Sequence, residues 1–336
     1  MPSHITQNLN ANETALCGGI AGATARVVIA PLDVVKIRLQ VQNQPYSLGS
    51  MLSRPSTMTS GVKYTGMWQA FRVIATEEGV RGLFKGNMSA EYLYLSYGIT
   101  QFYAYHHLDT LLDKFQMSSM IRVFVSGMLA GSIATTITYP FDLLRTRFAM
   151  QGSEKTLYHS VSHALHHIYH SEGLSGLYRG LMPSITQIMP YMGLTFLSYD
   201  MLRSGVQWLK DHHYTSNRYD VFHDMACGSL ASIISKTGVF PLDVIRKRLQ
   251  LQGPHRTDYV VTSIPCYARR SIFGCAKAIA RTEGFLALYK GLAPGLLKVG
   301  PAGAVNFLVF EWAKASCQRI KESGLPTISE NTLCIT

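Results

Sequence analysis

The chain has 336 residues and a formal net charge of +11, yet only 15% of its residues are charged and 47% are hydrophobic. Soluble globular proteins usually carry about 25% charged residues, so this composition favours a membrane protein. The six cysteines form no CxxC pair, and the sequence has no zinc pattern, basic tail or aromatic-and-basic RNA motif. It therefore indicates neither a disulfide framework nor a nucleic-acid partner.

The N-terminal part of the chain predicts a short tail followed by a long helix. Residues 1–13 contain no lysine, arginine or apolar run, so we expect a tail without a cleavable presequence. From Thr14 to about Gln42 the chain is apolar and exceeds the roughly 20 residues that cross a bilayer. Gly18 and Gly22 are spaced as small residues that let helices in lipid approach closely. The stretch 43–62 is rich in Ser, Pro and Gly and predicts a loop.

The end of this helix carries a phrase that occurs three times, about 100 residues apart. The three copies are PLDVVKIR at 31–38, PFDLLRTR at 140–147 and PLDVIRKR at 241–248. A second phrase follows each copy, as EGVRGLFKG at 78–86, EGLSGLYRG at 172–180 and EGFLALYKG at 283–291. We expect a short amphipathic helix between the two phrases and a second long apolar helix after them, which makes a repeated structural unit.

The repeats set the expected organisation of the whole chain. We predict an all-α membrane protein of six transmembrane helices in three tandem pseudo-threefold repeats, each with a short amphipathic helix. The predicted segments are an N-terminal tail at 1–13, repeats at 14–112, 118–209 and 220–320, and a C-terminal tail at 321–336. Six crossings place both termini on the same side of the membrane.

The three registered copies of PxDxxK/R and EGxxxLYKG resemble the mitochondrial carrier family over residues 14–320. The resemblance implies a multi-pass protein of the mitochondrial inner membrane, with a central cavity and a gate on the matrix and the cytoplasmic side. It implies a transporter, and we find no nucleophile elbow, P-loop, metal set or convincing carboxylate pair that would indicate an enzyme. We expect a monomer.

Three acids and three bases of the first phrase lie at equal depth on three helices. A charge inside a membrane is costly unless it pairs or faces water, so these six can close a ring. The resemblance adds a bracing glutamine four residues after the base, which the second repeat replaces with Ala149. We call this set the matrix gate: Asp33, Lys36, Asp142, Arg145, Asp243, Arg246, Gln40 and Gln250. The pairs implied by the resemblance join each base to the acid of the next repeat: Lys36–Asp142, Arg145–Asp243 and Arg246–Asp33.

The opposite gate is less complete. The family pattern of an aromatic residue, an acid and a base three residues later survives in two repeats and gives the cytoplasmic gate: Asp200, Arg203, Glu311 and Lys314. The first repeat has His106 and Asp109 instead, so the implied pairing leaves one ion pair and sets Asp109 against another acid. We predict that this gate holds weakly and that the empty protein favours the state open to the cytoplasm.

Three further cations point to the substrate. Arg26 and Lys236 each lie five residues before the proline of the first phrase, and Lys298 lies seven residues after a motif glycine. Cations in a membrane cavity without matched acids are costly, and a bound polyanion would relieve that cost. Neighbouring amide and aromatic side chains could read a heterocycle. The predicted substrate-binding set is Arg26, Lys236, Lys298, Gln187, Tyr191 and Thr135.

Four stretches look like the corresponding segments of those family members that carry thiamine pyrophosphate: residues 25–42, 141–152, 235–250 and 291–298. This likeness implies thiamine pyrophosphate as the substrate, moved into the matrix by alternating access in exchange for another phosphorylated anion, and no cofactor. Two alternatives stay open. One is a nucleotide or coenzyme A carrier of the same family, and the other is a proton-leak or scaffold protein of the membrane.

Two remaining features concern lipid and metal. The ends of the second phrase place a cation beside a helix N-terminus, which suits an anion, and the resemblance implies cardiolipin there: Lys85, Gly86, Arg179, Gly180, Lys290 and Gly291. Five histidines between His159 and His170 include pairs at i,i+4 spacing, which can chelate a transition metal. No acid or cysteine completes a set, so we expect a solvated face and no metal site.

Overall fold

The computed structural model describes residues 11–42, 63–115, 118–153, 156–211, 220–261, 264–267 and 271–322. Every regular element in these ranges is a helix, as predicted. The first helix begins at Ala11, three residues before its predicted start. The expected loop at 43–62 and residues 323–336 of the expected C-terminal tail lie outside the described residues.

Six long helices form the bundle in the described part of the chain. They are α1 (Ala11–Val41), α5 (Asn87–Asp113), α6 (Ser119–Ala149), α8 (Leu181–Asp211), α9 (Asp220–Gln250) and α12 (Val299–Glu322). Length and apolar composition alone qualify three stretches as membrane spans: Ile121–Ala149, Met225–Gln250 and Phe285–Cys317. The symmetry of the repeats extends that role to α1, α5 and α8.

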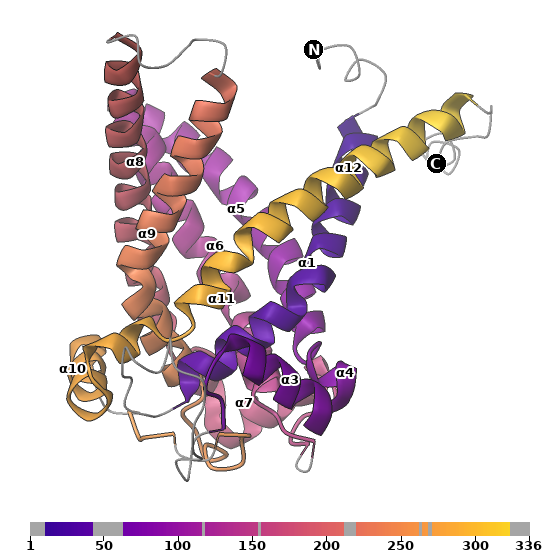
Figure 1. The fold of residues 1–336 in the computed structure, drawn as a ribbon, viewed down its shortest axis with the longest axis vertical. Coiled ribbons are helices and arrows are strands. Elements are labelled where there is room, and N and C mark those ends of the chain that lie inside the picture. The colour runs from indigo at the N-terminus through magenta and orange to yellow at the C-terminus, as the bar shows by residue number, and fades with distance from the viewer. Residues whose placement is uncertain are drawn as a thin grey trace.

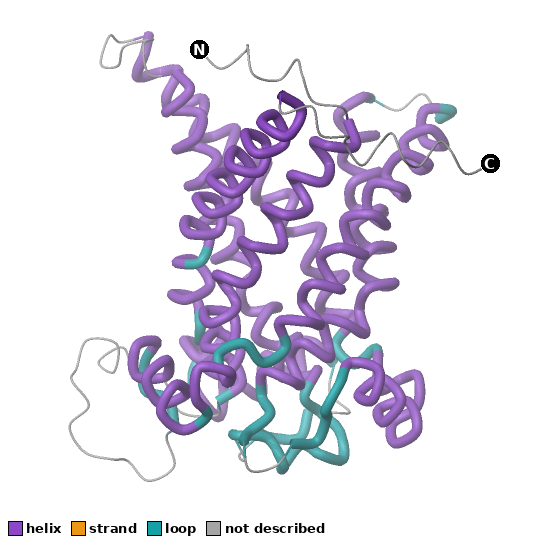
Figure 2. The backbone as a smooth tube through the Cα atoms, turned by 90° about the vertical axis from the view of Figure 1, so that its right-hand side faces the viewer, coloured by secondary structure: helices purple, strands orange, loops and turns teal. Residues whose placement is uncertain are grey.

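The long helices close a ring in which partners come from successive repeats. α5 packs along α6, α8 along α9, and α12 returns along α1. The short elements gather at one end of the ring, where the long helices converge (Figures 1 and 2). They are α3 (Met67–Glu77), α4 (Gly79–Gly82), α7 (Val161–Leu177), α10 (Ile272–Glu283), the 3-10 helix η2 (Phe285–Tyr289) and α11 (Leu292–Leu297). The start of α1 and the end of α12 both lie at the opposite, splayed end of the bundle, which agrees with termini on one side (Figure 1).

The splayed end corrects one expectation about helix packing. A Cβ atom added at Gly127 would lie 3.3 Å from the Met192 side chain, so a small residue does permit close packing there. Gly18, Gly22 and Gly228, in contrast, have nothing within 4 Å of an added Cβ. The predicted close contact is therefore wrong for Gly18 and Gly22, and Gly228 is equally open, because the helices diverge at this end of the bundle.

The second repeated phrase forms the turn that starts α5, α8 and α11. The first and the last glycine of the phrase have positive φ in every repeat: Gly79, Gly86, Gly173, Gly180, Gly284 and Gly291. Only glycine adopts this conformation without a steric penalty. The last glycine also lies close to the first long helix of the next repeat, since a Cβ at Gly86 would lie 2.7 Å from the carbonyl oxygen of Arg145 on α6. The turn thus fixes the start of one long helix against a gate residue of another.

Candidate transport site and gates

The six charged residues of the matrix gate meet where the long helices converge. Their ion pairs are Lys36–Asp243 at 2.6 Å, Arg246–Asp142 at 2.8 Å, and Arg145–Asp33. Each base therefore pairs with the acid of the preceding repeat around the ring, and the pairing expected from the resemblance, Lys36–Asp142, Arg145–Asp243 and Arg246–Asp33, is wrong. Either sense around the ring satisfies every charge, so the sequence pattern leaves the sense open and the three-dimensional arrangement of the helices decides it.

The bracing residues differ between the three ion pairs. The side-chain amide of Gln40 donates to Asp243 at 3.4 Å, and that of Gln250 donates to Asp142. The third pair has Ala149 at the equivalent position, and there Lys298 donates to Asp33 at 2.8 Å. The Tyr94 hydroxyl also supports this third pair, because it accepts a hydrogen bond from Arg145 at 3.0 Å.

The sequence reasoning missed Lys247, which adds a second cation to the gate. Its ammonium group lies 3.1 Å from Asp142 and donates to the Thr146 hydroxyl at 2.9 Å and to the side-chain amide oxygen (Oε1) of Gln250 at 3.0 Å. The signal was the unbroken run of three bases at 246–248, which only the third repeat contains.

A second ring of ion pairs lies beside the gate and was also missed. Arg38 forms a bidentate pair with Glu78, at 2.5 and 2.8 Å, and its Nε donates to the carbonyl oxygen of Ala149 at 2.9 Å. The other repeats repeat this geometry with Arg147–Glu172 and Arg248–Glu283. Burial raises the pKa of Glu78, but the hydrogen bonds and charge of Arg38 and Lys85 bring it below its usual value. The signal was the last arginine of the first phrase and the glutamate that opens the second.

The basic residues expected to bind lipid form ion pairs with the glutamates of this second ring. Lys85 donates to Glu78 and to the carbonyl oxygen of Gln151, both at 2.7 Å. Lys290 and Arg179 likewise pair with acids of the second ring, Lys290 with Glu283 at 2.6 Å and Arg179 with Glu172 at 3.2 Å. Each of these cations thus pairs with a carboxylate of the second ring, and lipid binding at the three turns stays a prediction.

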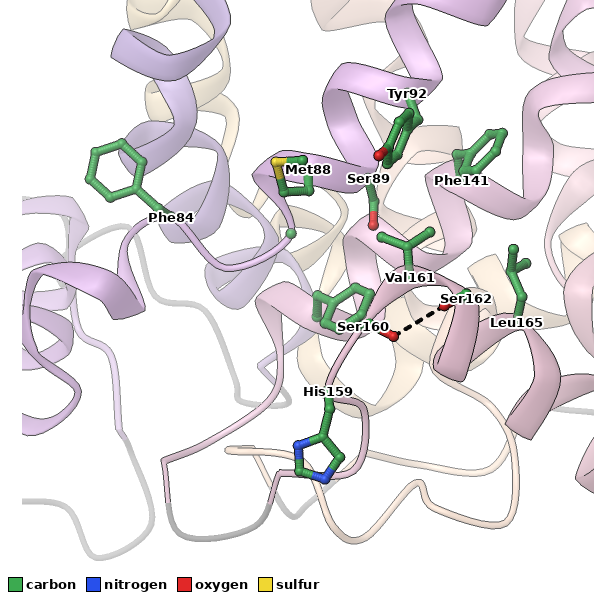
Figure 3. Close-up of a pocket in the computed structure, with 12 residues that line it drawn as sticks. Phe84, Met88, Ser89, Tyr92, Phe141, His159, Ser160, Val161, Ser162 and Leu165 are labelled. Carbon is green, nitrogen blue, oxygen red and sulfur yellow. Dashed lines mark hydrogen bonds between the residues drawn. The ribbon is translucent and has the colours of Figure 1, made fainter.

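A groove remains at one of the expected lipid sites. A cavity of about 690 Å³ lies between the starts of α5 and α7 and the side of α6, with Gly86 in its lining. Figure 3 shows apolar side chains such as Phe141 and Val161 around the hydroxyl group of Ser89. That hydroxyl is fully buried and has no hydrogen-bond partner. The groove therefore combines apolar walls with a polar group that lacks a partner.

The central cavity holds four of the six predicted substrate-binding residues. It has a volume of about 570 Å³, and its lining includes Thr135, Gln187, Tyr191 and Lys236, the tyrosines Tyr94 and Tyr97, and the gate residues Asp142, Arg145, Asp243 and Arg246. The side-chain amide oxygen of Gln187 is buried and has no hydrogen-bond partner. The cavity thus presents polar and aromatic groups above a charged closed end.

Arg26 and Lys298 lie one contact away from this cavity. The guanidinium of Arg26 stands 3.2 Å from the ring centre of Tyr94, and Lys298 is bound to Asp33. The expectation of three cations without acids is therefore corrected for Lys298, whereas the described contacts give Lys236 no ion pair. The three cations therefore lie near one another, but Lys298 also takes part in the matrix gate through Asp33.

The cytoplasmic gate is open. Among the described residues, no ion pair joins Asp200, Arg203, Glu311 and Lys314 across the splayed helices. Asp109 forms an ion pair with Arg122 at the start of α6, at 3.2 Å, and its placement against another acid in the closed gate stays a prediction. The unusual acid of the first repeat is therefore paired with a base of the second repeat, within the α5–α6 pair.

The histidine stripe lies on α7, at the end where the bundle is closed. The rings of His166 and His170 have centres 4.2 Å apart, and those of His167 and His255 are 5.2 Å apart. Within the described ranges, no group of three or more His, Cys, Asp or Glu side chains is arranged to hold a metal ion. Burial, followed by the charges of His255 and His163, lowers the pKa of His167.

A ring of long helices around a polar cavity, shut at one end by ion pairs and open at the other, defines a membrane transport protein. The model of the family described as mitochondrial carrier protein matches residues 7–116, 116–209 and 217–321. The chain belongs to the mitochondrial carrier family and is thus a transporter of mitochondrial membranes, not an enzyme.

Several curated relatives share most of the chain. A protein of Neosartorya fischeri named mitochondrial thiamine pyrophosphate carrier 1 is 43% identical over 311 residues, which cover 92% of this chain and 94% of the relative. Proteins of the same name from Emericella nidulans and Pyricularia oryzae are 44% and 43% identical, and the matches cover 92% and 89% of this chain and 94% and 90% of each relative.

Proposed function

We propose that this protein carries thiamine pyrophosphate across the mitochondrial inner membrane into the matrix, in exchange for another phosphorylated anion. The observation that carries the proposal is the excess of cations at the closed end of the cavity. The cations there are Arg26, Lys36, Arg145, Lys236, Arg246, Lys247 and Lys298, against the carboxylates Asp33, Asp142 and Asp243. Uncompensated positive charge in a membrane favours a polyanion, and the pyrophosphate group supplies one.

The part of the cavity farther from the matrix gate suits the aminopyrimidine ring of thiamine pyrophosphate. The aminopyrimidine ring has an amino group that could donate to the unpaired carbonyl oxygen of Gln187. A buried acceptor without a partner is unfavourable, so a ligand that donates to it gains affinity. Tyr97 and Tyr191 line the same cavity and offer ring faces for stacking. The names of the relatives agree with this chemistry.

Transport would follow from the asymmetry of the two gates. The cavity is open toward the splayed end, which we assign to the cytoplasm, and closed by the matrix gate. A bound polyanion neutralises the cation cluster, so the ion pairs that hold the matrix gate lose part of their advantage. A ligand shifts such an equilibrium only through its different affinity for the two states.

The proposal extends to the lipid and to the assembly. We place cardiolipin in the groove lined by Gly86 and Ser89, where a headgroup oxygen could accept the hydrogen bond that the Ser89 hydroxyl lacks. The rings of Phe141 and Phe148 would meet its acyl chains. The cavity and the matrix gate are complete within one chain, which supports a monomer.

Thermal unfolding of the purified protein in detergent tests the substrate. The ligands to compare are thiamine pyrophosphate, thiamine monophosphate, ADP, ATP, dephospho-coenzyme A and citrate. A ligand that binds only the folded protein raises the unfolding temperature by mass action. The expected result is a rise with thiamine pyrophosphate that Lys236→Ala abolishes and that Lys277→Ala, at an exposed lysine of α10, preserves.

The other outcomes decide between the alternatives. Stabilisation by ADP or the coenzyme A precursor in place of thiamine pyrophosphate would make the protein a nucleotide or coenzyme A carrier. Stabilisation by none of these anions would remove the support for an anion carrier and favour a proton-leak or scaffold protein.

A further inference from the structure

The three ion pairs of the matrix gate are not equivalent. We call each pair, with the residues that support it, an arm of the gate. Two arms are braced by glutamines, Gln40 and Gln250, whose side chains are fully buried and do not line the central cavity. The third arm, Asp33–Arg145, has the fully buried Ala149 at the equivalent position. Its support must come from elsewhere.

The acid of the third arm is shared between two cations. Arg145 pairs with one carboxylate oxygen of Asp33, and Lys298 donates to the other at 2.8 Å. Lys298 belongs to the predicted substrate-binding set and is partly exposed, with 20% of its side chain accessible. A residue predicted to meet the substrate therefore takes the place of a brace.

The base of the third arm has a similar second contact. The guanidinium of Arg145 donates to the Tyr94 hydroxyl at 3.0 Å. The same ring carries the guanidinium of Arg26, 3.2 Å from its centre. The ring quadrupole attracts a cation held over its face, and more strongly where the site is poorly hydrated. Tyr94 therefore joins a gate residue to a second member of the substrate-binding set.

We propose that Lys298 and Tyr94 form a lock on the Asp33–Arg145 arm that the substrate itself releases, so that the matrix gate opens first at this arm. The proposal rests on the proposed function, since it needs a polyanion that binds the cation cluster. Phosphate oxygens compete with Asp33 for Lys298 and draw Arg26 away from the Tyr94 ring. Asp33 then keeps one cation and no brace, whereas the other two arms keep their buried glutamines.

The first test needs no ligand and uses a double-mutant cycle on the unfolding temperature. Lys298→Gln should lower it by about 3 °C in the natural background and by much less in Asp33→Asn, because the two side chains act as one unit. Lys236→Gln is the matched control, since it removes a cavity cation without an ion pair, and its effect should add to that of Asp33→Asn. Additive effects of Lys298→Gln and Asp33→Asn would overturn the lock.

The second test separates a positioning role for Tyr94 from a packing role. Tyr94→Phe keeps the ring beneath Arg26 but removes the acceptor for Arg145. In liposomes preloaded with substrate, the lock predicts that kcat for thiamine pyrophosphate exchange rises about 2–5-fold while KM stays within twofold, because a weaker arm opens more readily. An unchanged kcat would contradict the proposal, as would a change confined to KM.

The two tests also separate this proposal from the proposed function. If thiamine pyrophosphate is neither bound nor exchanged by the natural protein, the proposed function fails. The ligand-free cycle still decides the lock, and the exchange measurement is then made with whichever anion of the panel stabilises the protein. Coupling between Asp33 and Lys298 without any stabilising anion would leave a structural ion pair and overturn release by substrate.

Discussion

The two ends of the bundle are built from the same three repeats but are held together very differently. At the closed end, each repeat contributes a gate ion pair, a second Arg–Glu pair and a glycine turn packed against a gate carbonyl. At the open end, Gly18, Gly22 and Gly228 face empty space, and within the described residues the gate charges form no pair between α5, α8 and α12. The ion pairs at the closed end hold the matrix gate shut, whereas the helices at the open end are not held together by such pairs.

This difference teaches where the free energy of the transport cycle resides. Ion pairs that are buried at the closed end are strongly coupled to their surroundings, whereas exposed pairs contribute about 0–1 kcal/mol. We therefore expect that opening the closed end needs a bound ligand, and that closing the open end needs only a small set of charges and small residues to come together. The following experiments test that comparison.

The largest effect is expected at Asp142, which is buried against Arg246, Lys247 and Gln250. Asp142→Asn leaves two buried cations without a carboxylate and should destabilise the ligand-free protein by about 3–5 kcal/mol, with loss of exchange. Asp109→Asn at the open end is the matched change and should cost about 1 kcal/mol or less. Unfolding temperatures of both variants measure the difference, and equal losses would contradict the comparison.

A smaller effect is expected when alanine replaces a motif glycine. At Gly180, φ is +84° and an added Cβ would lie 2.9 Å from the Tyr139 hydroxyl and 3.1 Å from the Arg246 carbonyl oxygen. Gly180→Ala should therefore cost about 2–4 kcal/mol from left-handed strain and overpacking. Gly228→Ala, in a helix with open space around it, should be neutral or stabilising by up to about 1 kcal/mol. The same unfolding assay checks both, and a destabilised Gly228→Ala would show that the open end is packed in solution.

Completing the open gate should alter transport more than stability. The double change His106→Asp with Asp109→Lys gives the first repeat the acid and base that its partners carry. By stabilising the closed cytoplasmic gate, it should slow exchange several-fold, with a stability change of about 1 kcal/mol or less. Asp109→Lys alone is the control, because it releases Arg122 without supplying the new acid. Exchange at the natural rate or faster in the double variant would contradict the prediction that the cytoplasmic gate is weak.

The smallest effect concerns pH at the closed end. Because the folded pKa of His167 lies below its ordinary value of 6.5, the unfolded chain binds a proton first as the pH falls through 6.5. Stability should therefore decline below pH about 6.5 and be unaffected by this group above it. We expect His167→Asn to reduce that decline by about 1 °C between pH 7.5 and 5.5, and His170→Asn, at an exposed site, to leave it unchanged. A larger change in the second variant would assign the effect to the exposed face.

Several features of the site could be predicted from the sequence because they depend on the spacing of residues along a helix. The spacing of the PxDxxK/R phrase places Asp33 and its counterparts at one depth, and Gln40 and Gln250 brace the gate as expected. Thr135, Gln187, Tyr191 and Lys236 do share one cavity. What failed was the choice of partner within the gate, as for Lys36, which pairs with Asp243 rather than with Asp142.

By itself, the sequence determined the three repeats, the all-helical class, the glycine turns and the depth of each charge, because these follow from local backbone preferences and helical period. Only the tertiary structure decided the sense of pairing around the gate, the second Arg–Glu ring and the link between Lys298 and Asp33. Each of these three contacts depends on how the long helices are rotated toward the axis of the bundle. At the closed end, a basic side chain has several carboxylates at similar distances, so the sequence alone cannot select its partner. Packing geometry, rather than residue type, makes that choice.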